Sequence, residues 1–145
     1  MMMGRFGYLL LVTSIFVGWN CVGPEEPTDG LLDDLPAVVN TADVFTFNIR
    51  GNKYSFEEQY TLSMHTDSNS VITTSLIVTG WSGNDTTRIF YKNAGDTTYA
   101  WFQITGNLTY TATDSLPNDT KYHPSKLLFE GTDFSGTMQY SMIKD

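Results

Sequence analysis

The chain has 145 residues, 16 of them acidic and 8 basic, which gives a formal net charge of −8. Nucleic acid and anionic lipid surfaces repel such a chain, and no cluster of basic residues offers them a binding patch. Nucleic acid is therefore excluded as an expected partner. Because Cys21 is the only cysteine, no internal disulfide can form, and the hydrophobic core has to stabilise the fold alone.

Residues 1–20 have the pattern of a secretory signal peptide. One basic residue, Arg5, precedes an apolar run at 8–17, and small and polar residues then lead to Cys21. This run is too short to cross a hydrocarbon core of ~30 Å, so it is not expected to be a membrane span. We expect it to direct the chain out of the cytoplasm.

The placement of Cys21 resembles the signal of bacterial lipoproteins, in which this cysteine becomes the lipid-bearing first residue of the mature protein. Gly18 and Asn20 depart from that signal, which usually has an aliphatic and a small residue at these positions. The resemblance implies lipid attachment at Cys21, membrane contact through that lipid, and a location in the cell envelope. A plain cleaved signal and a secreted protein are the alternative.

The segment 21–42 is expected to be a linker. It contains three prolines, two glycines and five carboxylates but no basic residue, a composition typical of an extended, self-repelling tether. The apolar pairs Leu31-Leu32 and Val38-Val39 indicate that part of it docks on the folded body. Residues 43–145 then have a length that suits a single small domain.

From residue 43 onward the composition favours β-strands. Threonine and aromatic residues, which fit a pleated and half-buried surface, dominate, and apolar residues alternate with period two. The expected strands are 44–50, 54–64, 71–79, 87–92, 97–104, 108–113, 126–130 and 134–143, with tight turns at 51–52 and 131–133 and a polar loop at 114–125.

Short connections between about eight strands favour antiparallel neighbours in a meander. We predict an all-β fold, a small meander barrel, because closing the sheet leaves no strand edge exposed. A two-sheet β-sandwich is the alternative.

No motif for catalysis or metal binding is found. His65 and His123 stand far apart in the sequence, no second His or Cys completes a ligand set, and no GxSxG, P-loop or GxGxxG is present. We therefore expect no catalytic residue, no metal and no cofactor. The sequence predicts a non-catalytic binding or accessory module of the cell envelope, whose partner is a glycan or another envelope protein.

Aromatic residues provide the first candidate site. If alternate residues from Ala100 to Ile104 face the core, then Tyr99, Trp101 and Gln103 form an outward stripe with Tyr91 nearby. Flat aromatic rings beside amides suit a sugar ring or a protein partner. In the alternative interpretation, Trp101 belongs to the core.

Glu58 is a further candidate because it is the one charge on the apolar face between Phe56 and Tyr60. Inside a barrel it would orient a ligand. A β-bulge at Glu57-Glu58, which would turn both carboxylates toward water, is the alternative.

Two other functions stay open. The first is a barrel that carries a hydrophobic ligand, which predicts a cavity lined by Phe45, Phe47, Phe56 and Phe102. The second is an inhibitor that acts through the loop 114–125.

Overall fold

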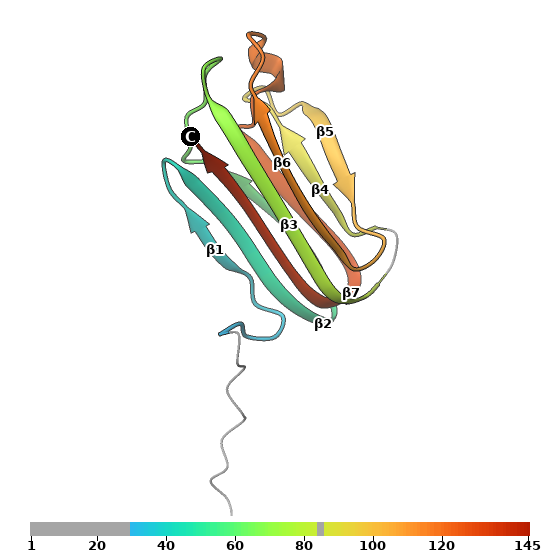
Figure 1. Ribbon diagram of the computed structural model, residues 1–145. Coiled ribbons are helices and arrows are strands. Elements are labelled where there is room, and N and C mark those ends of the chain that lie inside the picture. The colour runs from blue at the N-terminus through green and yellow to red at the C-terminus, as the bar shows by residue number, and fades with distance from the viewer. Residues whose placement is uncertain (1–29, 84–85) are drawn as a thin grey trace, which may run out of the picture. The chain divides into compact units, whose positions relative to one another are not determined.

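The structure is a computed structural model that describes residues 30–83 and 86–145 (Figure 1). The expected signal, Cys21 and the first part of the expected linker lie outside the described residues.

The predicted antiparallel all-β class is confirmed. In the described part, the one helical element is a 3-10 helix at Thr120–Tyr122, and no helix is long and apolar enough to cross a membrane. The strands are β1 (Ala37–Asn40), β2 (Val44–Thr61), β3 (Val71–Ser82), β4 (Arg88–Lys92), β5 (Thr98–Gln103), β6 (Leu108–Ser115) and β7 (Lys126–Lys144).

The long strands β2 and β7 run antiparallel through the whole fold and bend together. The first half of β2 pairs with the second half of β7, and the second half of β2 with the first half of β7. Between the halves the register shifts at Gly51 and Tyr54, and Lys53 takes a left-handed conformation with φ of 57°. Gly131 of β7 lies against Phe56, where a Cβ atom would come within 2.5 Å of the ring. A residue without a side chain is therefore needed where the strands bend.

The bend folds the sheet into two layers that share β2 and β7 (Figure 1). The first layer has the order β1-β2-β7-β3-β6, and the second has the order β2-β7-β4-β5. Phe47 of β2 and Phe129 of β7 are fully buried and stack with their ring centroids 4.1 Å apart. These rings lie on different halves of the bent strands, so they join the two layers in one core.

The strand order differs from the predicted meander barrel. β7, the last strand in the chain, pairs with β2, β3 and β4, so most neighbours in the sheet are distant in sequence. β5 pairs with β4 and β6 with β3, and the two are not paired with each other within the described residues. The described strands therefore form one curled sheet, a half-barrel that is open between β5 and β6, and neither a closed meander nor two separate sheets.

The tight turns predicted at 51–52 and 131–133 are wrong, because both segments lie inside strands. Four expected strands consequently merge into β2 and β7. The glycines in these segments permit close approach of aromatic rings instead of reversing the chain.

Part of the segment assigned to the linker belongs to the folded unit, which begins at Leu31. β1 pairs with the first half of β2, and Leu31 is buried. The Arg50 side chain bonds to the Asp33 carboxylate and donates to the Leu31 carbonyl at 2.7 Å. These contacts hold residues 31–40 against the edge of the first layer.

Candidate ligand-binding pocket

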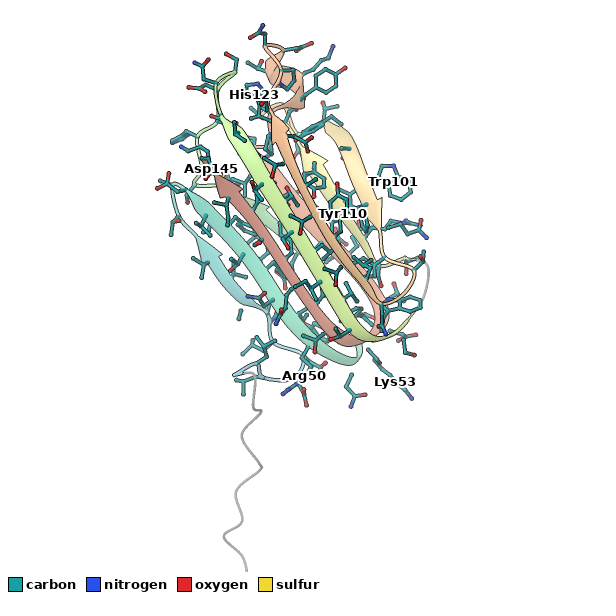
Figure 2. The ribbon with its side chains drawn as sticks, viewed as in Figure 1. Arg50, Lys53, Trp101, Tyr110, His123 and Asp145 are labelled. Carbon is teal, nitrogen blue, oxygen red and sulfur yellow. The ribbon has the colours of Figure 1, made fainter. Side chains whose placement is uncertain are left out.

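A pocket opens where β5 and β6 separate. The two strands are consecutive and joined by residues 104–107, and near this connection the Phe102 and Tyr110 rings lie 5.6 Å apart between centroids. Farther along, the space between the strands is a half-open pocket of about 350 Å³. Figure 2 places Tyr110 of β6 and Trp101 of β5 on this side of the molecule. The pocket therefore lies between the free edges of the two layers.

The floor of the pocket belongs to the core. Ile72, Thr74, Met142 and Tyr91 line it. The hydroxyl of Tyr140, a fully buried residue, donates a hydrogen bond to the Tyr91 hydroxyl at 3.3 Å. Burial raises the pKa of both tyrosines above the ordinary value, so both hydroxyls keep their protons at neutral pH.

The end of the pocket away from the β5–β6 connection is closed by a second aromatic pair. Tyr99 of β5 meets Tyr122 of the 3-10 helix edge to face, with ring centroids 6.1 Å apart. The segment 116–124 is held by a 2.7 Å hydrogen bond between His123 Nε2 and the Pro117 carbonyl. Burial, and next the neighbouring Tyr91, raise the pKa of Tyr99 well above the usual tyrosine value.

The remaining lining includes small and polar side chains, and also the apolar Leu116, Pro117 and Pro124. Ala100 of β5 and Ala112 of β6 stand on opposite walls, and Asp114 of β6 is the one Asp, Glu, Lys, Arg or His among the described lining residues. Between residues 30 and 145, leaving aside 84–85, no three His, Cys, Asp or Glu side chains are grouped to hold a metal ion. The pocket thus offers aromatic and aliphatic surfaces, hydroxyl groups and one carboxylate to a ligand.

The structure divides the expected aromatic stripe. Tyr91 pairs with Ala100 and Lys92 with Thr98, so Tyr99 is an extra, bulged residue in β5. Its ring lies 6.4 Å from that of Tyr91 at the pocket. The bulge breaks the alternation that the prediction assumed, and Tyr99 no longer shares a face with Trp101.

Trp101 lies at the rim and on the outer face of the second layer. It is 56% exposed, so the alternative that places it in the core is wrong. Its ring stacks on Phe90 at 6.4 Å, and the Arg88 guanidinium lies 5.9 Å from the ring centroid. Gln103, paired with Arg88 in the sheet, accompanies this outer cluster and does not line the pocket.

Glu58 lies far from these residues in the sheet. Residues 56–61 of β2 pair with β7 in continuous register, so the alternative of a bulge at Glu57-Glu58 is wrong. Glu58 accepts a hydrogen bond from the Tyr60 hydroxyl at 3.4 Å. Burial, and next the Glu58 charge, raise the pKa of Tyr60 to about 12. Since β7 and β4 stand between β2 and β5, Glu58 is not brought to the pocket.

The cavity expected for a carrier of hydrophobic ligands is not formed by its four phenylalanines. Phe45, Phe47 and Phe56 are buried and pack against one another or against neighbouring rings. Phe102 alone of the four lines the pocket. The space proposed for a carried ligand is therefore filled by side chains.

The loop considered for an inhibitor forms one wall of the pocket. Lys121 pairs with Asp119 at 2.7 Å, and its ammonium group lies 4.8 Å from the Tyr122 ring centroid. His123 is buried and supports the loop from within. An inhibitory role for this loop stays a prediction.

Sequence reasoning missed Tyr110, Asp114 and Tyr122 as pocket residues. Tyr110 and Asp114 are on one face of β6 by the period of two, together with Ala112. That alternation is visible in the sequence, but it does not reveal which strand lies across the gap. Tyr122 reaches the pocket through the fold of the loop, for which the sequence has no comparable signal.

No protein-family model and no curated protein matches the chain. Among solved structures, a family 16 carbohydrate-binding module aligns with a TM-score of 0.39 and 12% identity over 68% of this chain and 76% of that one. A structure described as "CBM4 structure and function" aligns with a TM-score of 0.35 and 10% identity over 74% and 88%. The enzymatically active domain of tailspike protein 4 of bacteriophage CBA120 aligns with a TM-score of 0.37 and 15% identity, over 75% of this chain and 17% of that one. At TM-scores below 0.5, these alignments carry no argument about function.

Proposed function

We propose that the chain is a non-catalytic binding module of the cell envelope, and that it holds a sugar residue of a glycan in the pocket between β5 and β6. One observation carries this proposal. The edges of β5 and β6 leave a pocket that opens to solvent between the two strands. An aromatic pair stands at each of its two ends.

The chemistry of the lining supports a sugar as the ligand. A sugar ring has apolar faces, which pack on aromatic rings, and hydroxyl groups at its edge, which need polar partners. The pocket supplies rings from Tyr99, Phe102 and Tyr110, and polar groups from Thr74 and Asp114. A purely apolar ligand would displace water from Asp114 without offering a hydrogen bond in its place, which costs free energy.

The size of the pocket supports a short ligand. Pockets for small molecules occupy roughly 300–1,000 Å³, and the pocket volume of about 350 Å³ lies near the lower limit. The Phe102–Tyr110 and Tyr99–Tyr122 contacts block the two ends. A terminal sugar or a side branch fits this shape better than the interior of a polysaccharide that runs through.

The location in the envelope rests on the sequence. The basic residue, the apolar run and Cys21 support a lipid anchor, and the acidic composition of 21–30 supports a tether that holds the module away from the membrane. The partner would then be a glycan at the cell surface. A glycan-bearing envelope protein would present the same chemistry.

A substitution that fills the pocket tests the binding proposal. Ala112→Phe adds a ring to the pocket wall, and Thr111→Phe adds the same ring to the outer face of the same strand. We expect Thr111→Phe to retain binding to a glycan array and Ala112→Phe to lose it, with both variants folded by circular dichroism. Equal binding by the two variants would contradict the pocket as the site.

The mass of the protein from its native membrane fraction tests the anchor. A chain that begins at Cys21 and carries diacylglyceryl and acyl groups is the expected result. An unlipidated chain would leave a secreted module, without affecting the test of the pocket.

A further inference from the structure

We propose that the ligand is a neutral sugar, that the Tyr91 hydroxyl donates a hydrogen bond to one of its oxygen atoms, and that Asp114 accepts a hydrogen bond from one of its hydroxyls. This inference rests on the proposed function and specifies the ligand class and two positioning contacts. It follows from the direction of one hydrogen bond and from the charge of the lining.

The hydrogen bond between Tyr140 and Tyr91 fixes the donor role of Tyr91. Tyr140 is 1% exposed, and its hydroxyl donates to the Tyr91 oxygen at 3.3 Å. A hydroxyl has one proton to donate and can accept in addition, so Tyr91 still has its own proton available. Among the described residues, no hydrogen bond takes up that proton.

The position of Tyr91 directs this donor toward the ligand. Tyr91 lies on β4 at the pocket floor, and its ring is flanked by Tyr99 at 6.4 Å. A ligand that covered this donor without accepting from it would lose free energy, whereas a ligand oxygen on the floor would accept its hydrogen bond. A ring oxygen, a hydroxyl or an acetamido carbonyl each meets this requirement, whereas a hydrocarbon does not.

The charge of the lining excludes acidic sugars. Asp114 is the one Asp, Glu, Lys, Arg or His on the pocket wall within the described chain, and it is exposed. A uronic acid carboxylate placed there would be repelled by Asp114 and would find no basic partner in the lining. A neutral sugar instead presents a hydroxyl that donates to this carboxylate, a charge-assisted hydrogen bond.

The two contacts lie at different depths of the pocket. Tyr91 is on the floor, and Asp114 is near the end of β6, where segment 116–124 begins. Aromatic rings line both sides of the pocket, with Tyr99 on β5 and Tyr110 on β6. A sugar ring lying between these walls would direct one edge toward the donor and another toward the acceptor.

The experiment compares matched sugars and matched tyrosine variants by NMR titration. The probes are the methyl glycosides of glucose, galactose and N-acetylglucosamine, with methyl glucuronide and methyl galacturonide as acidic counterparts. We expect at least one neutral glycoside to bind, and the acidic counterparts to bind at least tenfold more weakly. Tyr91→Phe should weaken binding of the neutral glycoside about fivefold to tenfold, the effect of one hydrogen bond.

The matched control is Tyr60→Phe, which removes a hydrogen-bonded tyrosine hydroxyl outside the pocket. The affinity of the Tyr60→Phe variant for the neutral glycoside should equal that of the original chain. If the original chain binds none of the neutral glycosides, the proposed function fails, and this inference fails with it. If it binds one, but Tyr91→Phe binds equally well or the acidic counterpart binds equally tightly, only this inference is overturned.

Discussion

The folded sheet has two open sides. Each is bounded by unpaired strand edges, but one is filled by side chains and the other is not. On one side, β1 and the second half of β2 form the edges, and on the other side β5 and β6 do. The β1–β2 side is filled by rings, with Tyr60 centred 5.7 Å from Phe45 and 5.9 Å from Phe47. The β5–β6 side retains a pocket of about 350 Å³.

Polar contacts strengthen the difference. Asn40 of β1 bridges to the end of β2, where its Nδ2 donates to the Thr61 carbonyl and its Oδ1 accepts from the Ser63 amide, both at 2.8 Å. Across the gap between β5 and β6, alanines at 100 and 112 occupy the walls. Side-chain size and bridging contacts, and not strand order alone, therefore decide which side of this half-barrel leaves room for a ligand.

Phe47→Ala should destabilise the filled side and produce the largest loss in the free energy of unfolding. Removing a fully buried ring that stacks on Phe129 is expected to lower the free energy of unfolding by about 4 kcal/mol in urea denaturation. Phe102→Ala on the pocket side is the control, with an expected loss of about 1–2 kcal/mol because its ring is only half-buried. Equal losses would show that the two sides are packed alike.

Asn40→Ala tests the bridge on the closed side. Loss of both hydrogen bonds is expected to lower the free energy of unfolding by about 1–2 kcal/mol. Asn40→Asp retains an oxygen acceptor for the Ser63 amide but sets a carboxylate oxygen against the Thr61 carbonyl, so it should recover little of this loss. A variant as stable as the original chain would mean that the bridge does not stabilise the closed side.

High pH should reveal the smallest of these effects, at Tyr60. Its pKa is about 12 in the fold, above the ordinary value of 10.0. The unfolded chain therefore loses this proton first, so the contribution is present below pH 10 and is lost as the pH rises from 10 to 12. Tyr60→Phe should make the decline in stability over this range shallower. The measurement is denaturation of both chains at several pH values. If the stability of the Tyr60→Phe variant declined as steeply as that of the original chain, a raised pKa of Tyr60 would be contradicted.

The sequence predicts the strands well because period-two alternation records which face of a strand is buried. β3, β4, β5 and β6 are found close to their expected bounds. The turn predictions at 51–52 and 131–133 fail because Gly51 and Gly131 favour a reversal locally, while long-range pairing of β2 with β7 keeps the strands continuous. Local propensity carries no information about such pairing.

The candidate site is only partly readable from the sequence. Of the predicted stripe and its neighbour, Tyr91, Tyr99 and Trp101 line the pocket, whereas Gln103 does not. The bulge at Tyr99 is a property of the pairing with β4, so the face of Tyr99 could not be inferred from alternation. Glu58 was placed correctly beside Phe56 and Tyr60, but the strand order separates it from the aromatic group.

If the proposed function is right, the β5–β6 side of the sheet admits a sugar and the β1–β2 side does not. The most direct measurement is a map of amide chemical-shift changes in the folded unit as a bound neutral glycoside is added. We expect changes confined to β4, β5, β6 and residues 116–124, with β1 and residues 54–61 unaffected. Changes centred on β1 and the second half of β2 would contradict this expectation.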